Sequence, residues 1–232
     1  MKKASLEQFI NRYNLGGEVE SVKITSTDSE MKVSFISDDK TLLGEVTSKE
    51  GEFPNGEFGV YTTSQLKALL GVLESSMDVD STESYIKFSD KGTSVNYMLA
   101  DLSVIPVVPD LKQLPNFNVD VTIDSTFITR FNKAKGALAD EKNFTFECKG
   151  GKGQIIIGHS NINTNRISIY VDCKCDGDVS PISFSADFLK EILNSNRDAK
   201  TASLKISTDG LAHLHFEVDS YISDYYLVQI QS

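Results

Sequence analysis

Four small groups of residues in this 232-residue sequence have types and spacings that chemistry could use. Ser64 and Lys67 match the S-x-x-K pattern, in which a lysine one helical turn away serves a serine nucleophile as base. The companion S-D-N and K-T-G patterns are missing, and the first turn of an expected helix commonly carries such polar residues. Gly150-Gly151-Lys152-Gly153 lacks the G-x-x-x-x-G-K-[ST] spacing that cradles phosphate, so it predicts a hairpin turn.

Histidine and cysteine are the other candidates, as metal ligands. His213 and His215 alternate along one expected strand and therefore share a face, but no third ligand is identifiable nearby in the sequence, which favours packed or surface histidines. Cys148, Cys173 and Cys175 cannot all pair within one chain, and C-x-C on a strand is not the usual zinc knuckle, so we expect reduced, structural thiols. With no set of nucleophile, acid and base and no cofactor fingerprint, the sequence predicts neither an enzyme nor a cofactor or metal site.

Composition is that of a soluble globular protein, with 40% hydrophobic and 24% charged residues. No apolar run approaches the ~20 residues of a membrane helix, and the N-terminus lacks an apolar segment of signal-peptide length. We therefore expect a cytoplasmic protein with no membrane partner. The net charge of −10, taken alone, argues against a nucleic-acid partner, because phosphate binding requires basic surface. The distribution of the charges has to decide.

An internal repeat organises the chain. Phe9-Ile10-Asn11-Arg12-Tyr13-Asn14 returns as Phe127-Ile128-Thr129-Arg130-Phe131-Asn132, with four of six positions identical. Residues 61–70 align with 184–193, and Ser89-Asp90-Lys91-Gly92 aligns with Ser207-Thr208-Asp209-Gly210, in the same order and at nearly the same offset, close to half the chain length. The sequence therefore predicts a tandem duplication.

Each half is expected to run helix, strands, helix, strands. Apolar residues at helical spacing predict helices over 5–15, from Thr62 or Thr63 onward, 125–137 and 185–195, with Gly16-Gly17 ending the first. Short alternating runs predict antiparallel strands at 31–36, 42–46, 85–88, 94–99, 143–148, 154–158, 167–173, 202–207, 211–218 and 224–230. The fold class is α+β, with two tandem domains, 1–110 and 111–232, each with antiparallel sheets and two helices. A proline-containing stretch, about 101–118, connects them.

The outward faces of the helices lack acids, which is informative in an acidic protein. Projection at ~100° per residue turns neutral and basic side chains outward on three of the helices, whereas the helix over 185–195 mixes in Asp187 and Glu191, followed by Asp198. Solvated charges alone could account for any single lysine, but the basic positions match across the repeat. A surface that faces a polyanion is the functional alternative. Its candidate residues are Arg12, Lys67, Arg130, Lys133, Lys190 and Arg197.

Two tandem α+β repeats with paired helices, a proline-containing connector and a final strand ending Asp224-Tyr225-Tyr226-Leu227-Val228-Gln229-Ile230 resemble the sliding clamps of tailed, myovirus-type bacteriophages. These clamps are DNA polymerase processivity factors. The resemblance covers essentially the whole chain and rests on architecture, length and weak local similarity, since clamps have no diagnostic catalytic motif.

The resemblance implies a homotrimeric ring with the DNA clamp fold, in which six similar domains place twelve helices around a central hole. Duplex DNA threads the hole without sequence preference, and the ring tethers the DNA polymerase after a separate ATP-dependent clamp loader has opened it. The location would be the cytoplasm of an infected host cell. Contacts to phosphate alone carry no sequence information, which suits sliding.

Two protein contacts are expected. Unpaired strand edges have to be covered or paired, so we expect the strand over 94–99 of one subunit to meet that over 166–173 of the next, with interface residues Val95, Tyr97, Ile167 and Ile169. The apolar run in the connector either packs on the domain cores or borders a groove for a short apolar partner peptide. In the clamps that this sequence resembles, the groove lies between the connector and the end of the chain. The residues at the corresponding positions here are Val104, Ile105, Pro106, Val107, Tyr226, Leu227 and Val228.

A second hypothesis comes from another class of protein. Two β-rich repeats could serve only to oligomerise, as in a structural or assembly protein such as a virion component. Acid-free helix faces favour the clamp, because a structural protein has no reason to keep them so.

Overall fold

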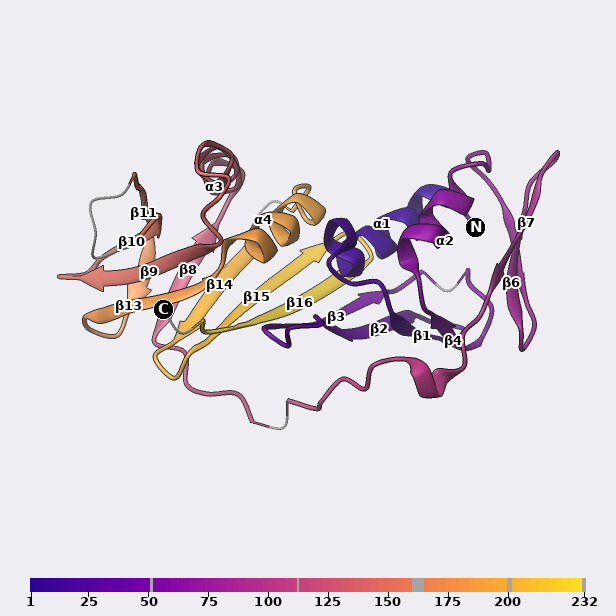
Figure 1. Ribbon diagram of the computed structural model, residues 1–232, viewed down its shortest axis with the longest axis horizontal. Coiled ribbons are helices and arrows are strands. Elements are labelled where there is room, and N and C mark those ends of the chain that lie inside the picture. Colours follow the sequence, from indigo (N-terminus) through magenta and orange to yellow (C-terminus); the bar gives the residue numbers. More distant parts are fainter. Residues whose placement is uncertain (51, 112, 160–164, 200–201, 231–232) are drawn as a thin grey trace. The chain divides into compact units, whose positions relative to one another are not determined.

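The computed structural model describes residues 1–50, 52–111, 113–159, 165–199 and 202–230 (Figure 1). The chain forms two compact units. Unit 1 comprises 1–38, 43–109 and 219–223, and unit 2 comprises 39–42, 110–218 and 224–232. Residue 112, inside the expected connector, lies outside the described residues.

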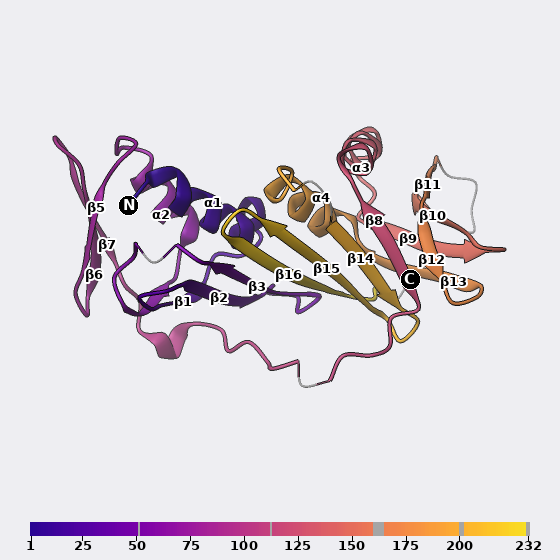
Figure 2. The ribbon, with the colours of Figure 1, turned by 180° about the vertical axis from the view of Figure 1, so that it is seen from behind.

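Unit 1 pairs two helices with a Greek-key sheet. Its elements are α1 (Lys3–Asn14), η1 (Leu15–Gly17), β1 (Val22–Ser26), β2 (Met31–Ile36), β3 (Leu42–Ser48), β4 (Gly56–Val60), α2 (Thr63–Leu70), β5 (Asp78–Ser81), β6 (Tyr85–Ser89), β7 (Ser94–Met98) and η2 (Leu102–Val104). The larger sheet has the order β4-β1-β2-β3, the strand order of a Greek key, and β5-β6-β7 form a separate sheet. Both views show α1 and α2 on one side of the larger sheet and the start of the connector on the other (Figures 1 and 2).

The local sequence explains which face of α1 is buried and where the helix ends. Leu6, Phe9, Ile10 and Tyr13 are buried along one stripe, as the helical spacing predicts. The helix ends where Leu15 adopts a left-handed conformation at φ 48° and Gly16 follows at φ 73°. Glycine adopts positive φ without steric cost, so the predicted stop at Gly16-Gly17 is confirmed.

Unit 2 repeats this plan with two added strands. Its elements are β8 (Val119–Ile123), α3 (Ser125–Ala137), β9 (Asn143–Lys149), β10 (Lys152–Ile157), β11 (Ile167–Val171), β12 (Cys173–Cys175), β13 (Val179–Ser185), α4 (Ala186–Ser195), β14 (Ala202–Ser207), β15 (Leu211–Val218) and β16 (Tyr221–Val228). The sheet order β13-β9-β10-β11 matches β4-β1-β2-β3 of unit 1, and β14-β15-β16 match β5-β6-β7. The added β8 pairs with β14, and β12 pairs with β8.

The matching topology confirms the predicted α+β fold class with two similar repeats of antiparallel sheets and two helices each. The strand ranges named from the sequence leave out β1, β4, β5, β8, β12 and β13. Sequence reasoning merged β12 with β11, although Asp172 separates the two and they pair in different sheets. β5 and β12, with four and three residues, carry too few alternations to be recognised from pattern alone. β13 contains Pro181, which interrupts a strand pattern.

The exposed side of the β15–β16 pair carries a polar cluster that the sequence alone did not predict. One oxygen of Asp224, Oδ1, lies 2.7 Å from His213 Nε2 and 2.9 Å from His215 Nδ1. Tyr226 stacks on the His213 ring at 4.6 Å between centroids. The third polar partner, not identifiable near the histidines in sequence, thus comes from the neighbouring strand.

The contacts in this cluster shift the pKa values of His215 and Asp224 in the directions that favour the charged form of each. Burial alone would lower the pKa of His215, but the hydrogen bond and charge of Asp224, helped by Glu217, raise it above its ordinary 6.5. Burial would likewise raise the pKa of Asp224, and the two histidines instead hold it below 3.8. His215 therefore adds stability below about pH 6.5 that is lost as pH rises through its folded-state pKa, and Asp224 adds stability that is lost as pH falls through its own.

We predict that His215→Gln lowers the thermal midpoint most between about pH 4 and pH 6.5, and that the deficit shrinks as pH rises beyond this window. Midpoints of both proteins, measured by circular dichroism across pH 4 to 9, provide the check. The exposed His159 gives a matched control, since His159→Gln should leave the profile unchanged. A deficit that is equal at every pH would contradict the assignment.

Candidate functional site

The four helices share a surface property that the rest of the protein lacks. Within the described residues, no fully exposed position of α1 to α4 carries a carboxylate, although the chain has 33 acids. The most exposed helical acid, Glu7 on α1, has a 40% exposed side chain and lies 3.7 Å from Lys3 Nζ. The exposed helical residues are Ala4, Gln8, Asn11, Ser64, Gln65, Ala68, Ser125, Thr126, Thr129, Arg130, Lys133, Gly136, Ala137 and Asn194. Exposed acids lie instead on strands, for example Glu57, Asp78, Asp120 and Glu217. The helices thus present neutral to basic surface on an acidic protein.

The basic candidates differ in how far they reach solvent. Arg130 and Lys133 on α3 are exposed, as is Arg197 just after α4. Lys67 and Lys190 are half-buried. Lys67 Nζ donates to Asn14 Oδ1 at 3.3 Å, and Lys190 Nζ lies 3.4 Å from Glu191 Oε1. Arg130, Lys133 and Arg197 are therefore accessible to an anion in solution. Lys67 and Lys190 would first have to break their contacts with Asn14 and Glu191.

The expectation that Arg12 points outward is wrong. The side chain is buried, with 2% exposure, and its guanidinium lies 4.4 Å from the centre of the Tyr221 ring. Tyr221 also donates its hydroxyl to the Ser5 carbonyl at 2.9 Å, so it covers the side of α1 that the helical projection left open. Arg12 supports the packing of unit 1 and cannot reach a phosphate in this conformation.

The acids on α4, which interrupt the acid-free pattern in the sequence, have cationic partners. Asp187 lies 2.9 Å from Lys135 Nζ on α3 and 3.3 Å from Lys142 Nζ. Burial alone would raise the pKa of Asp187, but the two lysines outweigh it and lower the pKa below 3.8. Lys135 is almost fully buried, so its pair with Asp187 links α3 to α4, although 34% of the Asp187 side chain remains exposed.

The S-x-x-K residues do not form a dyad. Ser64 Oγ donates to Glu20 and Lys67 Nζ donates to Asn14, so neither group is directed at the other. Glu20 also accepts from the Ser64 backbone N–H at 2.8 Å, which satisfies the start of α2. These contacts explain the pair as helix-end structure.

The strands β7 and β11 lie at the ends of their sheets. Both contain residues that the sequence predicts for subunit contact. Among the described residues, the outer backbone groups of these two strands pair with no further strand. Such edges are templates for adding a strand.

The side chains on these edges differ from those predicted. Val95, Tyr97 and Ile169 are buried within their own units and Ile167 is half-buried, so they reach an edge partner mainly through the backbone. The alternate positions expose Met98 at 65% and Tyr170 at 73%. Side chains alternate between the two faces of a strand. The prediction selected residues by their apolar alternation, and these face the core, so the residues between them are the exposed ones.

An apolar groove adjoins the β11 edge. It has a volume of about 470 Å³ and is lined by Arg130, Lys133 and Ala134 of α3 and by Ile167, Ser168, Ile169 and Tyr170 of β11. Sequence reasoning had placed Arg130 and Lys133 on a DNA-facing surface and Ile167 and Ile169 at an interface, and the structure brings the two sets together.

A second groove lies in unit 1 beneath the connector. It has a volume of about 400 Å³ and is lined by Lys23, Thr25, Lys32, Ser34, Leu102, Ile105, Pro106, Val107 and Val108. Strands β1 and β2 supply a polar floor, in which Lys23 and Lys32 pair with glutamates at 2.7 Å. The connector supplies an apolar wall, and Val107 is 91% exposed.

The structure brings together only part of the predicted partner groove. Ile105, Pro106 and Val107 line the groove in unit 1, and Val104 is exposed but does not line it. Leu227 is fully buried, so its expected contact with a peptide is wrong. Along β16 the odd positions face the core. Tyr226 and Val228 are half-buried in unit 2, and their part in the groove stays a prediction.

No described helix is both long and apolar enough to span a membrane. No family model matches the sequence, and the search of curated proteins finds no significant match.

Solved structures, in contrast, match over the whole chain. Proliferating cellular nuclear antigen (PCNA) from Entamoeba histolytica superimposes with a TM-score of 0.75 at 14% identity, covering 100% of this chain and 97% of that one. A chain of the PCNA2–PCNA3 complex from Sulfolobus tokodaii gives 0.75 at 12% identity, with 99% and 97% coverage. A. fulgidus PCNA, solved with the C-terminal region of FEN-1 bound, gives 0.77 at 16% identity, with 100% and 98% coverage. The chain has the PCNA-like clamp fold.

Proposed function

We propose that this protein is a sliding clamp, which encircles duplex DNA and tethers a DNA polymerase. The observation that carries the proposal is that no fully exposed position of the four described helices holds a carboxylate, and that the partly exposed Glu7, Asp187 and Glu191 are each paired with a lysine, in an acidic chain with the clamp fold. A helical lining of this kind attracts phosphates weakly and without sequence preference, while the acidic remainder repels DNA from other surfaces. Arg130, Lys133 and Arg197 make the direct phosphate contacts, and Lys67 and Lys190 contribute once released from their neighbours.

The proposed ring closes by backbone pairing between β7 of one copy and β11 of the next. Pairing would satisfy both sheet edges at once, and heterologous contacts of this kind close into a ring when the rotation permits. Met98 and Tyr170 supply the exposed apolar side chains at this contact, and the groove between α3 and β11 gives a partner side chain a place to bury. A homotrimer, with two repeats per copy, is the assembly that the clamp resemblance implies.

We further propose a homotrimeric clamp of bacteriophage replication, working in the cytoplasm of the infected cell with a phage polymerase and an ATP-dependent loader. The resemblance of the repeats, connector and final strand to phage clamps supports this assignment. The clamp has no catalytic role of its own in this account, since the one candidate dyad, Ser64 and Lys67, is engaged elsewhere. A purely structural oligomer is the rival, and it provides no reason for helices whose fully exposed positions lack carboxylates.

The connector groove is the proposed docking site for the polymerase. An apolar peptide would lie against Ile105, Pro106 and Val107 with the strand floor beneath it. The complex of A. fulgidus PCNA with the C-terminal region of FEN-1 supports peptide capture by a clamp of this fold.

We predict that Tyr170→Asp dissociates the oligomer. A charge on the edge would be desolvated when β11 pairs, so the equilibrium should shift toward monomer by tenfold or more, about 1.4 kcal/mol. Sedimentation velocity across a concentration series measures the shift. Leu114→Asp is the matched control, since Leu114 is an exposed apolar residue that belongs to neither β7 nor β11. A monomeric wild-type protein at tens of micromolar, about the upper range for specific association, would refute the ring.

We also predict that Val107→Asp weakens binding of the polymerase's C-terminal peptide. Loss of one buried apolar contact costs about 1.5 to 3 kcal/mol, roughly a 10- to 100-fold rise in Kd by fluorescence anisotropy. Val107 is exposed, so folding should be unaffected. Leu111→Asp is the control on the same connector, because Leu111 is exposed but outside the groove lining. Equal affinity of both variants and wild type would remove the docking site from this groove.

A further inference from the structure

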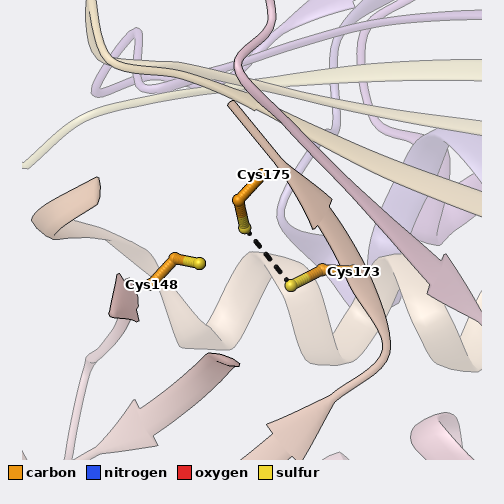
Figure 3. Close-up of side chains that lie close together, drawn as sticks. All are labelled: Cys148, Cys173 and Cys175. Carbon is orange, nitrogen blue, oxygen red and sulfur yellow. Dashed lines mark hydrogen bonds between the residues drawn. The ribbon is translucent and has the colours of Figure 1, made fainter. Parts of the chain in front are cut away.

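The three cysteines of the chain converge in unit 2. Cys173 and Cys175 lie on the short edge strand β12 and face the same side, because side chains alternate along a strand. Cys148 comes from β9, in the other sheet of the unit. Figure 3 shows the three thiols pointing toward one another, with the Cys173 and Cys175 sulfurs 3.3 Å apart. All three sulfur atoms lie within 4.8 Å of one another.

These separations fit one metal ion. A Zn–S bond of about 2.3 Å places tetrahedral thiolate ligands roughly 3.8 Å apart, and a trigonal arrangement places them at about 4.0 Å. In the protein, the Cys173 and Cys175 sulfurs are 3.3 Å apart, and the Cys148 sulfur lies no more than 4.8 Å from either of them. Small rotations of the three side chains therefore suffice to seat an ion between them.

The backbone around the cluster leaves room for the sulfurs. Gly153 on β10 pairs directly with Cys148, and a Cβ atom at Gly153 would stand only 2.3 Å from Cys173 Sγ. Glycine at this position is thus explained by the approach of Cys173.

Burial indicates a site that is open on one side. Cys148 is fully buried, whereas Cys173 and Cys175 are partly exposed. A fourth ligand, such as water, can therefore approach from the β12 side. Three sulfur ligands select thiophilic cations over magnesium or calcium, which prefer oxygen.

We propose that Cys148, Cys173 and Cys175 form a three-thiolate site for a thiophilic closed-shell cation, Zn²⁺ or Cu⁺. The ion would link β12, at the edge of one sheet, to β9 in the second sheet. Binding releases the thiol protons to solvent and changes no oxidation state. This site does not depend on the clamp function. It departs from the expectation of reduced, structural thiols, because sheet packing brings Cys148 to the C-x-C pair as a third possible ligand.

The test uses the full-length protein, reduced and freed of metal. Zn²⁺ is titrated in competition with a chromophoric chelator, Cu⁺ is titrated anaerobically in the same way, and Cd²⁺ is added as a probe of thiolate charge-transfer absorption. We expect one ion per chain for Zn²⁺ or Cu⁺, a charge-transfer band with Cd²⁺ and a raised thermal midpoint of the bound protein. Cys173→Ser and Cys175→Ser should weaken binding by at least 100-fold and abolish the band.

A matched control separates this site from the other cluster of potential ligands in unit 2. His213, His215 and Asp224 also lie within 4.8 Å of one another, so the variant His213→Gln with Asp224→Asn should bind the ion as wild type does. Cys175 is partly exposed, so Cys175→Ser keeps the test valid if a change at the buried Cys148 prevents folding.

Three results would overturn the proposal. The first is unchanged ion binding in Cys173→Ser and Cys175→Ser. The second is loss of binding only in the histidine and aspartate variant. The third is failure of both Zn²⁺ and Cu⁺ to bind the protein after thiol counting has verified three free thiols per chain.

Discussion

The open backbone edges of β7 and β11 are the constraint on which the functional account depends. A sheet that ends in solvent leaves donors and acceptors in a row, and proteins cover, pair or disrupt such rows. Here each edge instead displays a large apolar side chain, Met98 or Tyr170, and the second edge adjoins an apolar groove. Pairing of the two edges between copies would satisfy both. Without this pairing between copies no ring would form, and the weak phosphate contacts of the helices could not by themselves hold DNA.

A ring-shaped clamp would also explain why no fully exposed position of the four described helices carries a carboxylate. A protein that holds DNA by topology needs little affinity, so a few cations suffice where the duplex passes. The ion pairs follow this logic, since the partly exposed Asp187 is neutralised by Lys135 of α3 and by Lys142. Acids accumulate on strands instead, as with Asp120 and Glu217. The net charge of the chain is therefore a poor indicator of its binding partner, and the charge of the helical surface is a better one.

Local pattern predicted the helices, the repeat and most strands, because each is encoded by periodicity within one segment. It failed where distant segments meet. Arg12 is buried because Tyr221 covers α1, and the partner of His213 and His215 is Asp224 on the next strand. Cys148 reaches the C-x-C pair only through the packing of two sheets. None of these contacts leaves a signal in the spacing of residues along the chain, so the sequence predicted neither the burial of Arg12 nor the two side-chain clusters.

The most direct test of the central claim separates topological from electrostatic binding to DNA. Protein is allowed to thread onto a linear duplex anchored at one end, the free end is then capped with a bulky protein block, and the complex is washed with high salt. An encircling ring should stay on the capped duplex, because salt screens phosphate contacts but cannot open a closed path. It should leave when an internal restriction cut frees the end. Release by salt at the same rate from capped and uncapped duplex would contradict the account.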